Sequence, residues 1–486
     1  MAAVMFQGTG SDVGKSVIVA GVCRALANRG LKVRPFKPQN MSNNAAVAGD
    51  GGEIGRAQAL QAIACRVAPS VHMNPVLIKP QSDTGAQIVV RGVVRETADT
   101  RYFRENKSEL LAIVMDSFSR LSRDADIVVV EGAGSPAETN LREHDIANMG
   151  FARAAQVPVV LIGDIDRGGV IASLVGTHAV LDEPDRSMIK AFLINKFRGE
   201  IRLFDAGLSE IERRTGWASL GVIPWLATAR RLPAEDAVAL DAVHENDGAL
   251  RIAVPMLSRI ANFDDFDALA REPGVRLRMI APGTPIPSDT QVIILPGSKA
   301  TIADLRFLRA QGWDIDIAAH VRQGGRVVGI CGGFQMLGRT ITDTDGIEGP
   351  AESVQGLGLL PLHTRLAGSK QVREVRGRSI ASGAEFDGYE IHVGQTHIEP
   401  GVAAWLRFDD GTPDGAVSAD GKVSGCYVHG LFNRAEFRGD WLRSLGTPSD
   451  RIEQDVYVNA ALDELAAQLE RTIAFDRLLD IAGYRP

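Results

Sequence analysis

Cysteine is scarce in this sequence, and the few copies are far apart. The chain has four cysteines in 486 residues, at positions 23, 65, 331 and 426, and no two of them form a CxxC pair. This spacing excludes a disulfide scaffold and a cysteine-rich zinc site. It favours a reducing compartment, so we expect a cytoplasmic protein.

Long apolar runs and clustered positive charge are also missing. No stretch reaches the roughly 18 uninterrupted apolar residues that a membrane-spanning helix needs, and the first residues lack the basic segment and apolar core of a signal peptide. The net charge is −7, without a basic run or stripe. We therefore expect no membrane and no nucleic acid as a partner, while the oligomeric state stays open.

What the sequence does contain is an alternation of short apolar runs with longer helical patterns. A chain of this length is too long for one hydrophobic core. The alternation predicts an α/β fold, with two doubly wound domains whose sheets are mainly parallel. The expected strands lie at residues 4–6, 127–130, 157–162, 190–194, 251–254, 292–295 and 327–330.

The boundary between the two domains is expected in the polar segment Pro233–Gly248. This predicts an N-terminal domain at residues 1–235, a second domain at 250–443 and a helical C-terminal tail at 444–486. A region rich in glycine and charge, Gly346–Gly388, is expected to hold insertions.

The most informative motif is Gly329–Gly333, which places Cys331 between glycines directly after an apolar run. A strand that enters a glycine-flanked nucleophile before a helix is the sequence form of a nucleophile elbow. We predict that Cys331 is an acyl-transfer nucleophile. The backbone at Gly297 and Gly332 is expected to hold an oxyanion, and Gln335 to flank the pocket.

A base for this cysteine is expected further along the chain. His429 stands at the end of an apolar run, where it could take the thiol proton and pair with the resulting thiolate. His392 and His397 are competing candidates.

A second glycine-rich loop lies near the start of the chain. An apolar run at residues 4–6 leads into the loop 8–16 and then into a helical pattern. This context predicts a phosphate-binding loop, in which backbone N–H groups and the helix N-terminus cradle phosphate oxygens. We expect it to bind a nucleotide and Mg²⁺, with Lys15 on the outer phosphates and Ser16 on the metal. The expected nucleotide-binding residues are Gly8, Thr9, Asp12, Val13, Gly14, Lys15 and Ser16.

Polar residues at the ends of other apolar runs add to this candidate site. Glu131 ends the run 127–130 and is a candidate Mg²⁺ ligand, as is Glu53. Asn195 ends another run and could contact the nucleotide. A further polar group could bind phosphate, metal or an anionic substrate, or form a salt-bridged turn; it consists of Asp164, Asp166 and Arg167.

Two partial resemblances extend these predictions. The loop pattern resembles dethiobiotin synthetase and its relatives, which use ATP to activate a carboxylate and carry a lysine near the phosphates, here Lys37. Residues 251–443 resemble a class I glutamine amidotransferase domain through Gly-Ile-Cys-Gly-Gly-Phe-Gln. This implies that Cys331 releases ammonia from glutamine. Many such domains have a carboxylate two residues after the histidine, but Leu431 stands there, so a Cys–His dyad or a third member from elsewhere remains open.

The whole chain resembles the adenosylcobyric acid synthase family, through the segments 37–44, 53–58, 163–169, 195–199 and 388–392. The resemblance implies ATP- and glutamine-dependent amidation of carboxylates b, d, e and g of adenosylcobyrinic acid a,c-diamide, a corrinoid of cobalamin biosynthesis. Each carboxylate would be activated as an acyl phosphate. The candidate substrate residues are then Asn40, Asn44, Asp164, Asp166 and Arg167.

Two other functions stay open. Cobyrinic acid a,c-diamide synthase would use the same two domains on an earlier corrinoid, although the segments 40–44 and 164–169 favour the later enzyme. A P-loop ATPase of the partition type would act as a switch and need no glutaminase. That class usually has a second lysine within the loop, where this chain has Gly10.

Overall fold

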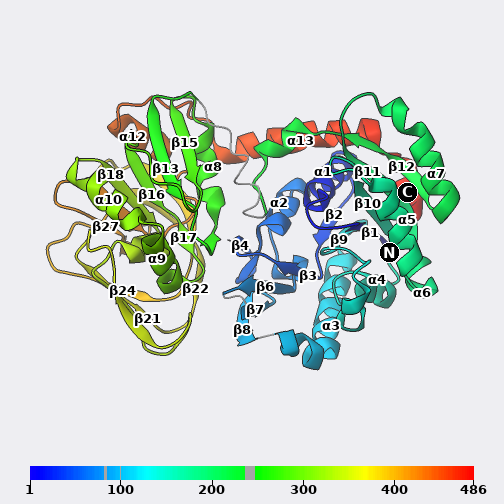
Figure 1. Cartoon of the computed structure of the whole chain (residues 1–486), viewed down its shortest axis with the longest axis horizontal. Coiled ribbons are helices and arrows are strands. Elements are labelled where there is room, and N and C mark those ends of the chain that lie inside the picture. Colours follow the sequence, from blue (N-terminus) through cyan, green and yellow to red (C-terminus); the bar gives the residue numbers. More distant parts are fainter. Residues whose placement is uncertain (82–84, 99, 236–246, 486) are drawn as a thin grey trace.

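The computed structural model describes residues 1–486 apart from 82–84, 99, 236–246 and 486, and it shows two lobes (Figure 1). The first lobe contains a six-stranded sheet in the order β12-β11-β10-β1-β9-β2, in which all neighbours are parallel. Its strands are β1 (Ala2–Gly8), β2 (Val33–Phe36), β9 (Ile127–Glu131), β10 (Val159–Asp164), β11 (Ile189–Phe197) and β12 (Ala218–Pro224).

Most residues in the strands of this sheet are apolar, since helices cover both faces and bury the side chains on each side. Successive side chains of β1 therefore enter different clusters, with Val4 and Phe6 in one and Met5 in the other. The first cluster includes residues of α1 (Lys15–Asn28), α2 (Arg56–Ala64), α13 (Gln454–Thr472) and α14 (Phe475–Ala482). The second includes residues of α3 (Thr100–Arg123), α4 (Met149–Ala155), α5 (Val170–Val180) and α7 (Asp205–Thr215).

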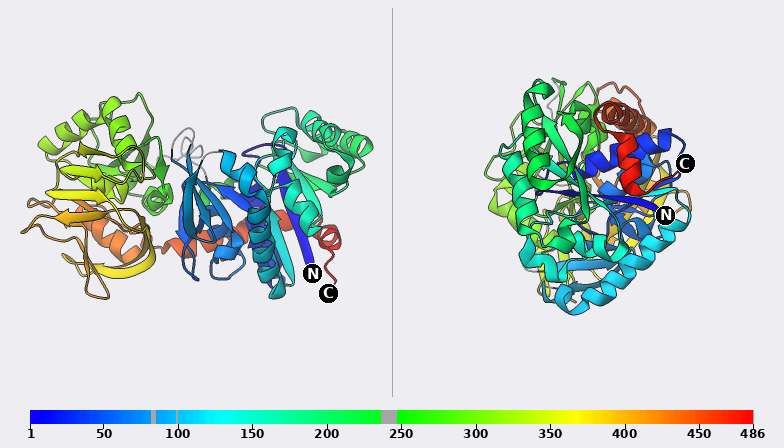
Figure 2. Two further views of the ribbon diagram at one scale, coloured as in Figure 1. Left: turned by 90° about the horizontal axis from the view of Figure 1, so that it is seen from below. Right: turned by 90° about the vertical axis from the view of Figure 1, so that its right-hand side faces the viewer.

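A smaller unit lies between the main sheet and the second lobe (Figure 2). It consists of a four-stranded sheet in the order β3-β6-β7-β8 and a short hairpin of β4 and β5. Its strands are β3 (Gln39–Met41), β4 (Ala45–Val47), β5 (Glu53–Gly55), β6 (Val76–Pro80), β7 (Ala86–Val90) and β8 (Val93–Ala98).

The second lobe is built on another six-stranded sheet, in the order β15-β13-β16-β18-β28-β27, in which only β27 is antiparallel to its neighbour. The predicted α/β fold with two mainly parallel sheets is thus confirmed. The strands are β13 (Leu250–Pro255), β15 (Val275–Ile280), β16 (Val292–Leu295), β18 (Arg326–Ile330), β27 (Ala416–Val417) and β28 (Val423–Cys426). The helices are α8 (Asp267–Arg271), α9 (Thr301–Ala310), α10 (Trp313–Arg322), α11 (Gly332–Met336) and α12 (Ala435–Ser444).

The segment Gly346–Gly388 is more regular than its composition indicates. It contributes strands to two four-stranded sheets, in the orders β20-β19-β21-β24 and β23-β22-β25-β26. Much of β22 is exposed, so its sequence lacks the apolar run of a buried strand. The strands are β19 (Thr340–Asp343), β20 (Glu352–Gln355), β21 (Leu362–Leu366), β22 (Gln371–Ser379), β23 (Glu385–His392), β24 (Gln395–Ile398), β25 (Leu406–Phe408) and β26 (Pro413–Asp414).

The C-terminal tail returns to the first lobe (Figure 1). α13 packs against α1, and the helices approach so closely that a Cβ on Gly21 would lie 2.4 Å from Leu469 Cδ1. None of the helices in the described part of the chain is long and apolar enough to cross a membrane. Most of the expected boundary, Pro233–Gly248, lies outside the described residues.

Candidate active site

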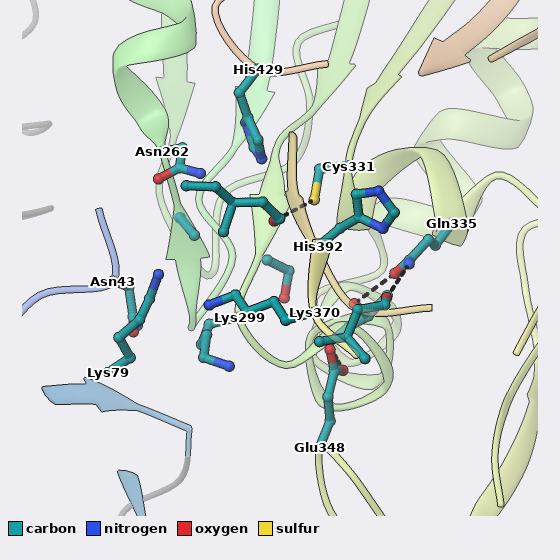
Figure 3. A pocket seen from close by; sticks show the side chains of 15 residues that line it. Asn43, Lys79, Asn262, Lys299, Cys331, Gln335, Glu348, Lys370, His392 and His429 are labelled. Atoms are coloured by element: carbon teal, nitrogen blue, oxygen red, sulfur yellow. Dashed lines mark hydrogen bonds between the residues drawn. The ribbon is translucent and has the colours of Figure 1, made fainter. Parts of the chain in front are cut away.

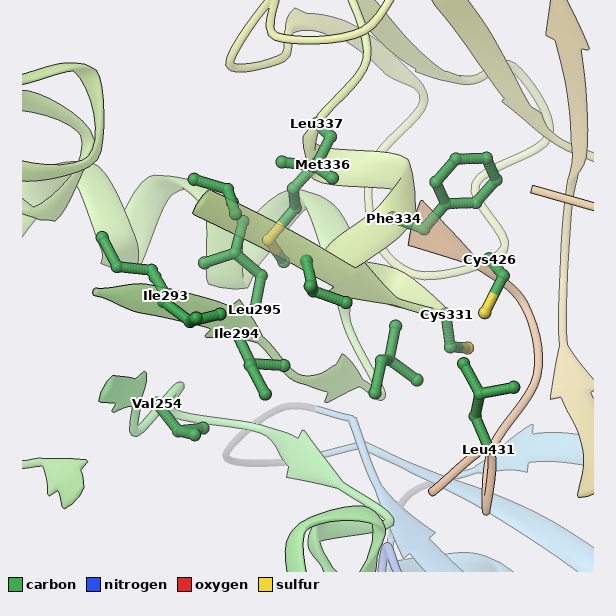
Figure 4. Packing of buried hydrophobic residues seen from close by; sticks show 14 of the residues in the cluster. Val254, Ile293, Ile294, Leu295, Cys331, Phe334, Met336, Leu337, Cys426 and Leu431 are labelled. Carbon is green, nitrogen blue, oxygen red and sulfur yellow. The ribbon is translucent and has the colours of Figure 1, made fainter. Parts of the chain in front are cut away.

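The glycine-flanked cysteine lies in a sharp turn between a strand and a helix. β18 ends at Ile330, α11 begins at Gly332, and Cys331 between them has φ 52° and ψ −109°. A positive φ is strained for a residue with a side chain, and such strain clusters at active sites. The turn is tightly packed, since a Cβ on Gly333 would lie 2.2 Å from Leu295 O. Apolar side chains of β16 and α11 support the turn (Figure 4).

His429 follows β28 and lines the same pocket as Cys331 (Figure 3). Its Nδ1 lies 2.7 Å from Asp265 Oδ2, and its ring stacks on Tyr389 with the centroids 5.3 Å apart. Burial acts to lower the pKa of His429, but the charges of Asp265 and Cys331 outweigh it and raise the pKa to about 10. The imidazole is therefore held in its protonated form at neutral pH.

Asp265 was not among the sequence candidates. It lies in the short helical turn Phe263–Phe266, far from His429 in sequence, and both of its carboxylate oxygens are used: Oδ1 accepts a 2.6 Å hydrogen bond from Gly430 N. A signal was present, because Asp264 and Asp265 form an acidic pair between two buried phenylalanines. Leu431, where a carboxylate was sought, is fully buried.

Replacing Asp265 with asparagine is expected to lower the rate of acyl transfer at Cys331 about 100-fold or more, because the imidazole loses the carboxylate charge that orients it and keeps it protonated. Loss of that charge should also move the pKa of His429 down from about 10 towards its ordinary value of 6.5. The imidazolium would then deprotonate at lower pH than in the parent enzyme. ¹⁵N-histidine NMR, with His429 assigned through His429→Asn, measures the midpoint, and an unchanged midpoint in Asp265→Asn would contradict this assignment.

The other residues predicted around Cys331 lie in the pocket wall. A Cβ on Gly297 would lie 2.8 Å from His429 Cε1, so glycine is required there. Gln335 is buried and anchored, because its amide accepts from Thr301 at 3.0 Å and donates to Val393 O at 3.0 Å. Of the competing histidines, His392 lines the pocket, whereas His397 is an exposed residue of β24.

Charged residues from both lobes line this pocket. Lys79 and Asn43 of the first lobe line it together with Lys299, Lys370 and Glu348 of the second (Figure 3). Burial lowers the pKa of Lys299 to about 8 and that of Lys370 to about 7, and it raises the pKa of Glu348 to about 7. The pocket around Cys331 is thus completed by the first lobe.

Glu53, predicted as a metal ligand, belongs to this charged group and not to the phosphate loop. It is fully buried, and its carboxylate contacts Lys370 and lies 2.8 Å from Lys79 Nζ. Although burial acts to raise the pKa of Glu53, the two lysines lower it to about 2. Each carboxylate oxygen is therefore bonded to a lysine Nζ, and Glu53 is not brought together with Ser16 and Glu131.

The phosphate loop runs from the end of β1 into α1. Gly14 has φ 93°, and a Cβ there would lie 2.4 Å from Asn195 Nδ2. Asn195 of β11 donates to Val13 O at 2.7 Å, so it braces the loop from a strand two positions away in the sheet. Lys15 Nζ donates to the carbonyls of Gly10 and Gly134 at 3.0 and 3.1 Å. Gly8 is needed because a Cβ there would lie 2.9 Å from the backbone oxygen of Gly10. Thr9 and Asp12 lie in the same loop: Thr9 N donates to Ile162 O at 2.9 Å, and Asp12 has a positive φ of 56°.

Oxygen ligands gather beside this loop. Ser16 Oγ lies 2.7 Å from Glu131 Oε1 and 2.5 Å from Glu235 Oε2, and Lys37 Nζ lies within 3.0 Å of both carboxylates. Burial acts to lower the pKa of Lys37, but Glu131 and Glu235 keep it above its ordinary value. Two carboxylates and a hydroxyl form an oxygen donor set that suits Mg²⁺. Glu235 was not a sequence candidate, because nothing local marks it as part of the loop.

The candidate substrate residues fall into two places. Asn40 and Asn44 lie on the smaller unit: Asn40 bonds Gln58, and Asn44 Oδ1 accepts from Asn262 N of the other lobe at 2.7 Å. The others lie by the phosphate loop, where their contacts are Asp164 with Lys196 at 2.8 Å, Asp166 with Arg198 at 2.6 Å and Arg167 with Asp12 at 3.7 Å. Asp164, Asp166 and Arg167 therefore form ion pairs in a turn beside the phosphate loop.

Comparison with known proteins agrees with this division into two sites. Residues 4–239 match the CobQ/CobB/MinD/ParA nucleotide binding domain, and residues 251–437 match the CobB/CobQ-like glutamine amidotransferase domain. The chain is 61% identical over 485 residues to cobyric acid synthase of a Caulobacter species, covering 99% of this chain and 100% of the relative. It is 58% identical over 481 residues to cobyric acid synthase of Brucella suis biovar 1, covering 99% of each.

The chain belongs to the cobyric acid synthase family. This confirms the resemblance drawn from its sequence, and it makes the chain a glutamine-hydrolysing carbon–nitrogen ligase. We refer below to the first lobe as the ATP lobe and to the second as the glutaminase lobe.

Proposed function

We propose that this enzyme amidates carboxylates b, d, e and g of adenosylcobyrinic acid a,c-diamide to give adenosylcobyric acid, using ATP, Mg²⁺ and glutamine. The observation that carries the proposal is one chain with a Cys331–His429–Asp265 constellation in one lobe and a phosphate loop with paired carboxylates in the other. The full-length similarity to cobyric acid synthases supports the corrinoid substrate.

In the glutaminase lobe, the Cys331 thiolate would attack the side-chain amide carbon of glutamine. His429 would give its proton to the departing ammonia, and backbone N–H groups near Gly297 and Gly332 would stabilise the oxyanion. Water would then hydrolyse the thioester to glutamate and regenerate the thiolate and the imidazolium.

In the ATP lobe, a substrate carboxylate oxygen would attack the γ-phosphorus and release ADP. Lys15 and Lys37 would pair with the charge that develops on the transferred phosphoryl group. Ser16, Glu131 and Glu235 would hold Mg²⁺, which neutralises phosphate charge when bound. Ammonia would then attack the acyl phosphate, form the C–N bond and expel phosphate. Phosphorylation is needed because a carboxylate has no adequate leaving group.

The decisive experiment is to incubate the enzyme with ATP, Mg²⁺ and glutamine and each of two corrinoids, adenosylcobyrinic acid a,c-diamide and cobyrinic acid. Four successive mass shifts of about one unit each on the first corrinoid support the proposal. Amidation of cobyrinic acid alone would instead identify a cobyrinic acid a,c-diamide synthase. ATP hydrolysis without amidation of either acid would favour an ATPase switch.

Glu235→Gln is expected to raise the Mg²⁺ concentration for half-maximal amidation about tenfold, because one charged oxygen ligand is lost. The measurement is the amidation rate against free Mg²⁺ at saturating ATP. Glu200→Gln, which removes an exposed carboxylate of the same lobe, is the matched control. An unchanged Mg²⁺ requirement in Glu235→Gln would remove this residue from the metal site.

A further inference from the structure

Arg56 belongs to the ATP lobe but reaches into the glutaminase lobe. It is the first residue of α2, directly after the hairpin strand β5. Its Nη2 atom contacts the Tyr389 hydroxyl, lies 3.1 Å from Asp264 Oδ2 and donates to Ala45 O of its own lobe at 2.9 Å. The side chain is 15% exposed, so these contacts are largely shielded from water.

Both glutaminase partners of Arg56 adjoin the catalytic imidazole. The Tyr389 ring is nearly parallel to that of His429, at 21°, and the two backbones exchange hydrogen bonds of 3.0 and 2.8 Å. Asp264 directly precedes Asp265, which holds His429 Nδ1. The imidazole is thus fixed by the Tyr389 ring and by the Asp265 carboxylate. Arg56 contacts the hydroxyl of Tyr389 and the carboxylate of Asp264, the residue next to Asp265.

The charge of Arg56 also suits its surroundings. Asp264, Asp265 and Asp267 place three carboxyl groups within four residues, and Arg56 pairs with the first of them. Leaving a buried carboxylate without its partner is costly, so its loop would move or the group would take up a proton. Either response would disturb the turn that carries Asp265.

The same helix contacts the ATP site. Gln61 of α2 donates to Glu131 Oε2 at 2.5 Å, and Gln58 accepts from Asn40 at 3.0 Å. With a rise of about 1.5 Å per residue, Arg56 and Gln61 are about 7.5 Å apart along the helix. One short rigid element therefore touches a candidate metal ligand and the support of the glutaminase base.

We propose that Arg56 is a positioning residue of the glutaminase, supplied by the ATP lobe, which acts through Tyr389 and Asp264 to hold His429 in place for Cys331. The glutaminase constellation is then incomplete without the other lobe. This inference rests on the proposed function, in that it requires glutamine hydrolysis at Cys331.

The test compares the full-length parent enzyme with Arg56→Gln and Arg56→Lys, measuring kcat and KM for glutamine and the rate of ammonia-dependent amidation. Arg56→Gln should lower kcat for glutamine hydrolysis about tenfold or more, since small displacements of a catalytic group have large effects. KM for glutamine should stay within about threefold, because Arg56 does not line the pocket. Arg56→Lys should recover much of kcat, because the three contacts converge on one nitrogen that an ammonium can replace.

Two further variants make the test specific. Arg24→Gln alters another buried arginine that joins distant parts of the chain, through Asn459 on α13, without touching Tyr389 or Asp264, and it should leave kcat unchanged. Tyr389→Phe keeps the stacked ring but removes the hydroxyl, and its effect should not add to that of Arg56→Gln.

Parent-like kcat in Arg56→Gln would overturn the proposal, and so would an equal fall in glutamine hydrolysis and in ammonia-dependent amidation, which indicates general loss of structure. The proposal would also be contradicted if kcat for glutamine hydrolysis were no higher in Arg56→Lys than in Arg56→Gln. If the parent enzyme itself releases no glutamate from glutamine, the proposed function fails instead, and the two failures are distinguishable.

Discussion

Cys331→Ala is expected to abolish glutamine-dependent amidation, with a loss of about 10³-fold or more, while amidation driven by added ammonium salt continues at the parent rate. The reason is that the sulfur of Cys331 would form the covalent bond to the glutamyl group, and alanine has no atom that can form it. The ATP lobe does not need the sulfur to activate the substrate carboxylate. The measurement is amide product by mass spectrometry, with glutamine or ammonium chloride as the nitrogen source.

Cys426→Ala is the matched control for this experiment. Cys426 lies at the end of the adjacent strand β28, and its side chain is fully buried (Figure 4). Replacing Cys426 should leave amidation unchanged with either glutamine or ammonium chloride as the nitrogen source. Parent-like glutamine hydrolysis in Cys331→Ala would require another nucleophile and would refute the assigned chemistry.

Lys15→Ala is expected to remove both routes, with a fall of about 10²-fold or more whichever nitrogen source is supplied. Lys15 stands where the loop enters α1, and burial lowers the pKa of its ammonium group although Glu131 acts in the opposite direction. Its charge would pair with the outer phosphates of ATP, so its loss affects carboxylate activation itself. ADP release, followed together with amide formation, measures the effect.

The control for Lys15→Ala is Lys32→Ala, which removes an exposed ammonium group from the same lobe. This variant should retain amidation with glutamine and with ammonium chloride. Thermal melting of the two variants separates a loss of chemistry from a loss of fold. Full turnover by Lys15→Ala with either nitrogen source would refute the ATP-site assignment.

The features predicted well from the sequence are those that a short segment determines by itself. The strand–turn–helix at Cys331 and the loop before α1 need glycines at fixed positions, because a Cβ on Gly333 or Gly14 would collide with neighbouring atoms. The parallel strands are marked by continuous apolar runs, since both of their faces are buried. Such constraints are local and can therefore be read without the fold.

The features that were missed depend on segments far apart in the chain. Asp265 meets His429 across 164 positions, and Glu235 meets Ser16 across 219. No spacing rule connects such pairs, because the sheet order and the loops bring them together. The exposed strands of the segment Gly346–Gly388 were missed for a different reason, since half-exposed antiparallel strands need few apolar residues.

The return of α13 and α14 to α1 makes the ATP lobe discontinuous in sequence, with the glutaminase as an insertion. Leu462, Leu465 and Leu469 of α13 fill the same core as α1. On the ribosome, the lobe that is synthesised first would therefore complete its core last, after the glutaminase has emerged. Amide synthesis would become possible only once the ammonia source beside it is already in place.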